Sequence, residues 1–237
     1  MNIRINLSSR EKEESSSSSL WDWTSPKEDL FNPDVEYGTL VDARDGHEYK
    51  TVVIGEGDKV QEWMAENLNY AVDSSKCYME VPHYCDKVGR YYTWLQAIDT
   101  ACPEGWHIPS SNEWNTMRQN LWGNPDVRLA GVVYPDEIKT KLKTALYWER
   151  DSVPNLNSTG FSVFPAGYWK TTDAYNEFVA FGYSAVFWMA KMETWSVESI
   201  IIGWDANADH IRTGLREKTD FASVRCVRNR AQIVGTD

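Results

Sequence analysis

Short runs of apolar residues separated by polar turns mark the first part of the folded chain. Residues 38–47 contain a strand that enters a turn at Asp45-Gly46, and residues 49–54 (YKTVVI) form the returning strand. A second turn follows at residues 55–58, and a third strand begins at Glu62. This pattern predicts a β-meander.

Helical spacing replaces the alternation in the middle of the chain. Residues 92–101 place apolar side chains on one helical face. Ser110 and Glu113 form a capping box that starts a second helix, and Gly123 stops that helix. A third helical segment, residues 136–145, is short and rich in lysine.

The last part of the chain returns to strand patterns. Four short apolar or alternating runs are separated by polar loops: residues 161–167, 184–189, 199–204 and 223–227. Strands, then helices, then strands predict an α+β domain rather than a repeated βαβ unit.

Aromatic residues are abundant, with 12 Trp, 12 Tyr and 7 Phe among 237 residues. So many rings fill a sizeable core, which excludes a largely disordered chain. The formal net charge of −11 argues against binding to nucleic-acid phosphates or anionic lipid. The sequence contains no apolar run long enough to span a bilayer. We therefore expect no nucleic-acid partner and no membrane span.

The N-terminal segment differs in composition from the rest. Residues 8–19 (SSREKEESSSSS) are polar and of low complexity, so residues 1–36 are interpreted as a flexible tether and lead-in, and residues 37–237 as the domain. The alternative is an arbitrary disordered tail. The rings of residues 20–23 are expected to staple the tail onto the domain, or else to contact a partner. No signal peptide is visible, so the protein is either cytosolic or exported with its signal removed.

The four cysteines, Cys77, Cys85, Cys102 and Cys226, contain no Cys-x-x-Cys pair and no clustered histidines accompany them. This spacing does not indicate a zinc site. An even count among turn-rich strands favours disulfides and an oxidising compartment. The nearest pairing is Cys77–Cys85, which leaves Cys102–Cys226. The alternative is four reduced, partly buried thiols.

Eight segments carry distinctive motifs: residues 38–46 (GTLVDARDG), 49–52 (YKTV), 63–70 (WMAENLNY), 89–94 (GRYYTW), 102–114 (CPEGWHIPSSNEW), 160–168 (GFSVFPAGY), 187–188 (FW) and 223–228 (SVRCVR). Together they resemble the Fibrobacter succinogenes major paralogous domain family, over about residues 38–228. This resemblance implies an exported, surface-associated domain of Fibrobacter and Bacteroides-type bacteria.

A second resemblance bears on the fold. The segment from Cys102 to Glu113 is similar to the helix-entry segment of C-type lectin-like domains, where a cysteine bonds one in the terminal strand, as proposed for Cys102 and Cys226. Residues 106–114 also resemble the formylglycine-generating enzyme group, which shares that fold. The resemblance implies a C-type lectin-like fold with mixed or antiparallel sheets, two main helices and long loops that carry binding.

Metal and cofactor sites are not expected. The Glu-Pro-Asn or Gln-Pro-Asp loop that chelates calcium and sugar in lectins does not occur in the sequence. Residues 205–209 fit the start of an EF-hand loop, but His210 and Arg216 stand where the turn glycine and the bidentate glutamate are needed. This segment is predicted to be a polar hairpin loop.

Catalysis finds little support in the sequence. The formylglycine-generating group needs a reactive or copper-binding cysteine pair near the C-terminus, and here the only late cysteine is Cys226. The four histidines are scattered without a nucleophile partner. His107 is interpreted as a hydrogen-bonding residue of the core and Glu113 as a helix cap. We therefore expect a protein that is not an enzyme.

Nine of the tryptophans divide into two groups. Five lie in family motifs on apolar faces and are predicted to be core: Trp63, Trp94, Trp106, Trp114 and Trp188. Four lie in loops or on late strands: Trp148, Trp169, Trp195 and Trp204. With Asp205, the second group is the candidate ligand-binding face, since a half-exposed Trp stacks on a sugar ring or anchors a protein contact. The alternative is that these rings pack under the loops as satellite core.

The leading hypothesis is a recognition or adhesion module that binds a glycan or a surface protein, exported to the cell surface, outer membrane or extracellular space. An N-terminal lipid anchor outside this chain is compatible with the serine tether. The alternatives are a structural or spacer domain of the envelope, an enzyme of the formylglycine-generating type, and a binding protein diversified by a retroelement.

Overall fold

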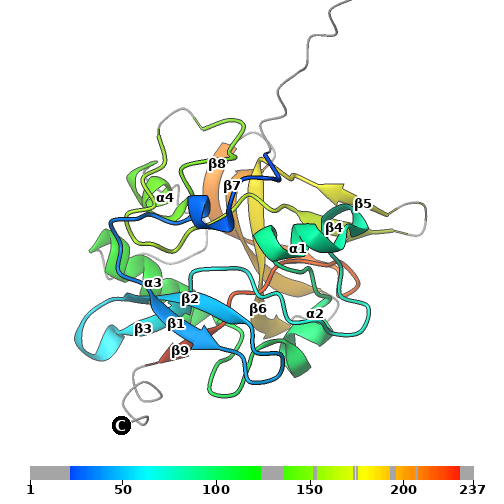
Figure 1. The fold of residues 1–237 in the computed structure, drawn as a ribbon, viewed down its shortest axis with the longest axis horizontal. Helices are drawn as coiled ribbons and strands as arrows, with labels where there is room; N and C mark the ends of the chain where they lie inside the picture. The colour runs from blue at the N-terminus through cyan, green and yellow to red at the C-terminus, as the bar shows by residue number, and fades with distance from the viewer. Residues whose placement is uncertain are drawn as a thin grey trace, which may run out of the picture.

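The first strands of the domain and its last strand meet in one antiparallel sheet. The computed structural model describes residues 22–123, 136–151, 154–172, 174, 176–192, 196–205 and 208–229. The sheet has the order β1-β2-β3-β9 (Figure 1). Its strands are β1 (Gly38–Val41), β2 (Glu48–Ile54), β3 (Gln61–Met64) and β9 (Val227–Asn229). The predicted β-meander is therefore present, and β9 pairs with its third strand.

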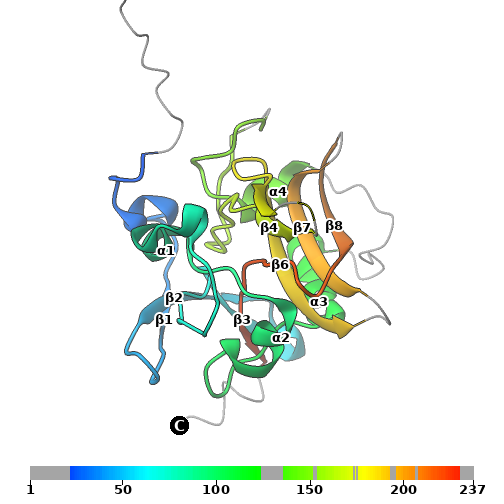
Figure 2. The same cartoon turned by 90° about the vertical axis from the view of Figure 1, so that its right-hand side faces the viewer.

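A second antiparallel sheet, of order β6-β7-β8, curves along one side of the molecule (Figure 2). Its strands are β6 (Ser184–Met192), β7 (Val197–Asp205) and β8 (Ala208–Arg216). A separate hairpin is formed by β4 (Tyr168–Thr171) and β5 (Asn176–Val179). The architecture is thus mixed α+β with antiparallel sheets.

Four α-helices and several single turns are found in the described part of the chain. The helices are α1 (Pro82–Val88), α2 (Trp94–Gln96), α3 (Ser111–Trp122) and α4 (Asp136–Leu142). The turns are the 3₁₀ helices η1 (Lys27–Leu30), η2 (Gly57–Lys59) and η3 (Tyr78–Glu80), and the π-helical η4 (Ala97–Ala101). Among the residues described, no helix has the length and apolar character needed to cross a membrane.

Side-chain caps set the helix boundaries. The predicted capping box of Ser110 and Glu113 is present at α3, and Gly123 ends the helix with a φ of 68°. The earlier helix begins at Trp94 rather than at residue 92, because Thr93 forms a capping box with Gln96. The predicted segment 136–145 is helical only to Leu142.

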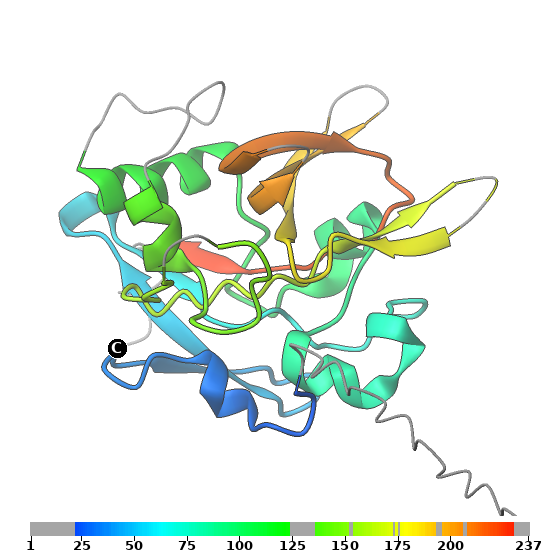
Figure 3. The ribbon, with the colours of Figure 1, turned by 90° about the horizontal axis from the view of Figure 1, so that it is seen from above.

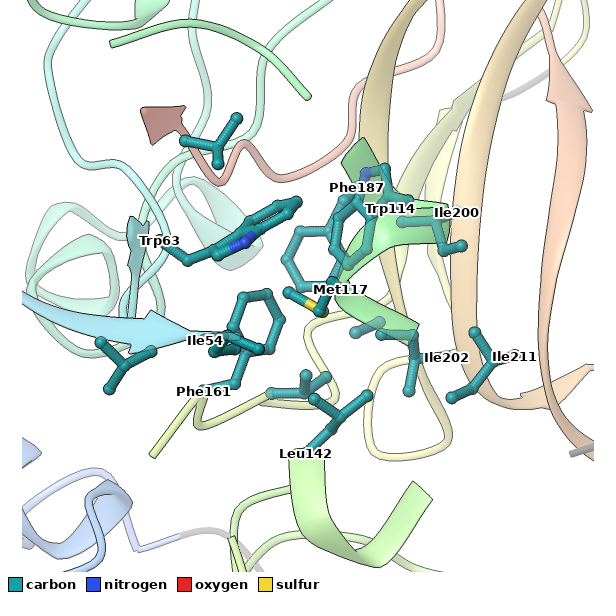
Figure 4. Close-up of a cluster of buried hydrophobic side chains, with 14 of the residues drawn as sticks. Ile54, Trp63, Trp114, Met117, Leu142, Phe161, Phe187, Ile200, Ile202 and Ile211 are labelled. Atoms are coloured by element: carbon teal, nitrogen blue, oxygen red, sulfur yellow. The ribbon is translucent and has the colours of Figure 1, made fainter. Parts of the chain in front are cut away.

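Aromatic rings fill the space between the sheets (Figure 4). Trp63 of β3 lies 4.7 Å from Trp114 of α3 and 5.6 Å from Phe161, measured between ring centres. Phe187 of β6 stacks 6.0 Å from Trp114. All five tryptophans predicted to be core are buried: Trp63, Trp94, Trp106, Trp114 and Trp188.

The prediction of strands at residues 161–167 and 223–227 is wrong, because neither segment forms a continuous strand. The first segment makes only isolated bridges, such as Lys143 with Val163, and β9 begins only at Val227. The reason is Arg225, whose guanidinium takes the backbone carbonyls of Phe161 and Ser162 as acceptors. Ser162 also has a φ of 54°, which interrupts an extended strand.

Several elements were not predicted from the sequence. They are α1, the hairpin β4–β5 and the strand β8. β8 pairs with β7 from Asp205–Ala208 to Val197–Arg216, so the segment predicted as a polar hairpin loop does join two strands. β8 itself is largely polar, and its pairing supplies the order that its own pattern does not signal.

The lead-in packs on the domain from Asp22 onward. Trp23 stacks 3.8 Å from Tyr84 and 5.6 Å from Tyr78, and Leu30 is buried. This contact agrees with the predicted stapling role of the aromatic residues before the domain. The rest of the predicted tether, residues 1–21, lies outside the described residues.

Both disulfides have the pairing that the sequence suggested. Cys77 and Cys85 are joined with a Cα–Cα distance of 5.1 Å. Cys102 and Cys226 are joined with a Cα–Cα distance of 5.8 Å across 124 positions of sequence. The second bond fixes the segment before α3 to the residue that precedes β9.

The two disulfides are expected to differ in their contribution to stability. Replacing Cys102 and Cys226 with Ala should lower the free energy of unfolding by about 5 kcal/mol, because the bond closes a long loop. The Cys77–Cys85 bond closes only a short loop, so replacing Cys77 and Cys85 with Ala should lower the free energy of unfolding by about 2–3 kcal/mol. Urea unfolding of both double variants measures the difference, and equal losses would contradict the loop-length argument.

Stability should also depend on the protonation of Glu113. Burial raises the pKa of this carboxyl, but hydrogen bonds from His107 and Ser110 outweigh that effect and lower the pKa from 4.5 to about 2. The unfolded chain therefore binds the proton more tightly, so this stabilisation is complete above pH 4.5 and is lost as the pH falls toward 2. Melts of Glu113→Gln should depend less on pH than wild type across this window.

The matched control for this measurement is Glu104→Gln, which changes an exposed carboxylate in the turn before α3. Its stability should follow the wild-type pH dependence. Parallel curves for wild type and Glu113→Gln would refute the assignment to Glu113.

Candidate functional site

The predicted binding residues lie in several places. Trp169 lies in β4 and Trp148 in the loop that follows α4. Trp204 and Asp205 end β7, where their backbone is paired with Asp209 and Ala208. Trp195 lies outside the described residues. Only Trp148 and Trp169 can therefore be placed by their side-chain surroundings, and they line two different grooves.

Trp169 lies in a groove between the β4–β5 hairpin and the loop before α1. We call it the Trp169 groove; it has a volume of about 370 Å³. Its lining includes Tyr78, Met79, Glu80, Trp169, Asn176 and Glu177. The hairpin projects from the body of the molecule, as the view from above shows (Figure 3). Side chains from two distant parts of the chain therefore face one space.

One wall of the Trp169 groove is a short loop closed by a disulfide. Met79 and Glu80 lie between the bonded residues Cys77 and Cys85. Both have positive φ, 52° and 59°, a conformation that costs free energy in residues other than glycine. Met79 is nevertheless 61% exposed, so the strained backbone presents a large apolar side chain to solvent. Such strain is typical of functional sites.

The other wall is the β4–β5 hairpin. Trp169 is directly opposite Phe178 in the strand register, and their rings meet edge to face at 4.7 Å. Lys76 Nζ lies 4.7 Å from the centre of the indole and 3.3 Å from a carboxylate oxygen of Glu80. The indole is half-buried. It therefore combines a fixed orientation with an accessible aromatic surface beside charged groups.

Stacked rings hold the first wall, the disulfide loop, against the rest of the domain. Tyr78 stacks on Phe181 with ring centres 3.7 Å apart, and Trp23 of the lead-in stacks on Tyr84. Burial raises the pKa of the Tyr78 hydroxyl above its ordinary value, so this group stays neutral at physiological pH. The groove thus offers rings, a thioether, two carboxylates, an amide and a neutral hydroxyl.

Trp148 lies in a second groove, between the lead-in and the loop after α4. We call it the Trp148 groove; it has a volume of about 730 Å³. Its lining includes Asp22, Asp29, Leu146, Trp148, Asp151 and Asn155. Trp148 also packs against the core, and its Nε1 donates to Thr144 Oγ1 at 3.2 Å. This ring is therefore partly structural, as the alternative interpretation of the late tryptophans expected.

Sequence reasoning missed most residues of the Trp169 groove. Met79 and Glu80 lie inside the predicted Cys77–Cys85 loop, for which the sequence predicted a disulfide and no binding role. Asn176 and Glu177 belong to a hairpin strand that no apolar pattern marks. The available signal was the large apolar residue held within a short disulfide loop.

His107 does not lie in the core as predicted. Its Nε2 is 2.5 Å from Glu113 Oε1, but the side chain is 38% exposed. Asn229 Nδ2 donates to the same carboxylate oxygen at 2.7 Å. Glu113 is therefore both the predicted helix cap and a link from α3 to β9.

Metal coordination has no ready set of ligands in the described ranges, where no three His, Cys, Asp or Glu residues come together to hold an ion. Within the described residues, the acidic side chains that line the two grooves therefore do not form a metal-binding cluster.

These features define an α+β domain with two disulfides and grooves built from loops. The Fibrobacter succinogenes major domain family matches residues 52–228, and the chain belongs to this family. No curated protein and no solved structure matches the chain. The family match includes every residue that lines the Trp169 groove, whereas Asp22 and Asp29 of the Trp148 groove precede it.

The exposure of Trp169 predicts a small effect of its removal on stability. Trp169→Ala should reduce the free energy of unfolding by clearly less than Trp114→Ala, because a half-buried ring leaves no enclosed cavity. The fully buried Trp114 should cost about 3–5 kcal/mol. Urea unfolding of both variants tests this. Similar losses would show that Trp169 is a core residue and would remove it from the candidate site.

Proposed function

We propose that this protein is a non-enzymatic, surface-displayed recognition module that binds a neutral glycan in the Trp169 groove. The observation that carries the proposal is the half-buried indole of Trp169 next to Glu80, Asn176 and Glu177 in one groove. Rings of this kind stack on the apolar faces of sugars, and carboxylates and amides accept hydrogen bonds from sugar hydroxyls.

Charge favours a neutral ligand over an anionic one. Glu80 and Glu177 place two carboxylates at the groove, and Lys76 already pairs with Glu80. The whole chain carries a net charge of −11. An anionic polymer would approach against this field, whereas a neutral glycan would not.

The rigidity of the groove supports a binding role. The Cys77–Cys85 bond and the stack of Tyr78 on Phe181 hold one wall. The pairing of β4 with β5 and of Trp169 with Phe221 holds the other. A site that is already ordered loses less conformational entropy on binding than a mobile loop does.

The finer fold assignment belongs to the same proposal. A C-type lectin-like fold is supported by the pairing of β9 with β3 and by the Cys102–Cys226 bond, which joins the segment before α3 to the residue before β9. In such a fold the long loops carry binding, and the Trp169 groove is built from loops and a hairpin. The two disulfides support export to an oxidising compartment, with the chain displayed at the cell surface.

A surface protein is the second candidate ligand. Met79 is exposed beside Tyr78 and Trp169, and exposed thioethers and aromatic rings are common anchors of protein interfaces. Three alternatives stay open: a purely structural role in the envelope, an enzyme of the formylglycine-generating type, and a retroelement-diversified binding protein. None of the residues described for the grooves favours any of these three.

Titration calorimetry with neutral hexasaccharides tests the proposal. Cellohexaose, xylohexaose and mannohexaose are the probes, and at least one should bind the wild-type protein. Trp169→Ala should weaken that binding by about 1–3 kcal/mol, if stacking on a sugar is as strong as the stacking of aromatic side chains on nucleic-acid bases. Asn176→Ala should weaken it by about 1 kcal/mol, the usual size of one hydrogen bond.

Leu95→Ala is the matched control, because Leu95 is an exposed apolar residue of α2 outside the groove. Leu95→Ala should bind the hexasaccharide with the same affinity as the wild-type protein. Binding of a hexasaccharide that is unchanged in Trp169→Ala would place the sugar elsewhere. The absence of binding to all three probes, together with capture of a protein through Met79, would favour the second candidate.

A further inference from the structure

A third groove is lined mostly by apolar residues. It lies between residues 28–37, β2 and the loop that follows α4. We call it the Phe31 groove; it has a volume of about 850 Å³. Its apolar lining consists of Phe31, Pro33, Val35, Tyr37, Ala145 and Leu146. Three of these residues are exposed, and Leu146 exposes 46% of its surface. The groove therefore presents to solvent a surface that favours a ligand with apolar side chains.

One side of the Phe31 groove is held by the core. Phe31, Val35 and Tyr37 are half-buried and pack against the cluster around Trp63. The rings of Phe31 and Tyr37 meet edge to face at 5.5 Å, and the Tyr37 hydroxyl accepts from the backbone N–H of Asn32 at 3.1 Å. Because these rings are already ordered, binding at this surface costs little conformational entropy in the domain.

Acidic side chains dominate the charge at the Phe31 groove. Glu28 and Asp29 are exposed in its lining, and neither forms an ion pair with another described residue. Lys50 is the one basic residue of the described lining, and its ammonium lies 5.2 Å from the ring centre of Phe31 and 5.3 Å from that of Tyr37. Two carboxylates beside one ammonium favour an apolar ligand that carries a positive charge over one that carries a negative charge.

Residues 1–7 of the same chain have the composition that fits this groove. They read MNIRINL, in which apolar and polar residues alternate and Arg4 is the only charged side chain. In an extended backbone alternate side chains point to opposite sides, so the four apolar side chains share one side. Residues 8–19, by contrast, contain no apolar side chain. The first seven residues therefore combine an apolar side with an arginine that is long enough to reach carboxylates at the edge of a groove.

The intervening chain can bring this segment to the Phe31 groove. Asp22, the first described residue, lines the Trp148 groove, which shares Asp29, Ala145 and Leu146 with the Phe31 groove. Residues 8–21 provide fourteen positions of largely serine-rich sequence. A flexible chain of that length has a typical end-to-end distance of about 20 Å. Since a short tether gives an effective concentration in the millimolar range, even weak contacts suffice for docking.

We propose that residues 1–7 dock in the Phe31 groove of their own chain, with their apolar side on its apolar lining and Arg4 facing Glu28 and Asp29. A second copy of the chain carries the same segment, but the tether keeps each segment close to its own groove. This contact does not depend on the function proposed for the Trp169 groove.

Paramagnetic relaxation in the full chain tests the proposal. All four native cysteines form disulfides, so a nitroxide attached to Asn2→Cys labels one place, on the polar side of the segment. The label should broaden the amide resonances of Phe31, Val35 and Leu146. A free tether would also bring the label near these residues, so the decisive comparison is between variants of the labelled chain.

The variant Ile3→Ser/Ile5→Ser should reduce the broadening at least threefold, whereas its matched control Asn6→Ser should retain it. Arg4→Gln should reduce the broadening, and Arg10→Gln, which removes a charge from the tether, should not. On the groove, Leu146→Ser should reduce it, whereas Leu95→Ser changes an exposed leucine outside the groove and should leave it unchanged. Both leucines are exposed, so these variants are expected to fold.

Equal broadening in Ile3→Ser/Ile5→Ser and in Asn6→Ser would overturn the proposal, because it would show a label that is merely near the groove. The absence of broadening at the groove would overturn it as well. A mixture of spin-labelled chains with isotope-labelled chains that lack the nitroxide should show no broadening. Broadening in that mixture as strong as in the singly labelled chain would assign the segment to a second copy and overturn docking within one chain.

Discussion

The buried guanidinium of Arg225 joins the parts of this domain. It is fully enclosed, and burial lowers its pKa to about 9. Its Nη1 donates to the carbonyl of Met64 at 3.1 Å and its Nη2 to that of Ser162 at 2.8 Å. The same group lies over the rings of Phe161 and Phe187, at 4.9 and 5.5 Å. Since a buried charge is tolerated only when its donors are satisfied, these acceptors must be held in place together.

This constraint extends to the Trp169 groove through a short chain of contacts. Asn67 accepts from Arg225 Nε at 2.8 Å and donates through Nδ2 to the carbonyl of Val88 at the end of α1. Gly89 follows with a φ of 77°, and a Cβ there would lie 2.5 Å from the Cβ of Asn67, so only glycine allows this approach. Helix α1 carries Cys85, which holds the loop of Met79. The core therefore fixes the position of one wall of the groove.

Local patterns explain which parts of the fold were predictable. The strands β1 to β3, the capping box at Ser110 and the five core tryptophans each depend on residues close together in sequence, and the structure contains all of them. Residues 161–167 failed as a strand because Arg225, more than fifty positions away, takes their carbonyl groups. The β4–β5 hairpin was not predicted for a related reason, since Trp169 is ordered by pairing with Phe178 and by its bridge to the distant Phe221. The apolar and polar residues next to Trp169 in the sequence do not indicate these partners.

The same limit applied to the candidate site. Tryptophans outside the family motifs were a usable signal, because two of them, both half-buried, line grooves. The sequence could not show that these grooves are different. Their chemistry depends on neighbours brought together only by the fold: Met79 and Glu177 beside Trp169, and Asp22 and Asn155 beside Trp148. A ring identifies a possible contact, whereas its neighbours decide the class of ligand.

The lead-in connects the two grooves physically. Trp23 stacks on Tyr84 and lies 5.6 Å from Tyr78, which lines the Trp169 groove. The preceding residue, Asp22, lines the Trp148 groove, and Ser25 Oγ is 2.7 Å from the hydroxyl of Tyr147. One short segment therefore packs against a wall of each groove. The packing of residues 22–25 therefore contributes to the walls of both grooves.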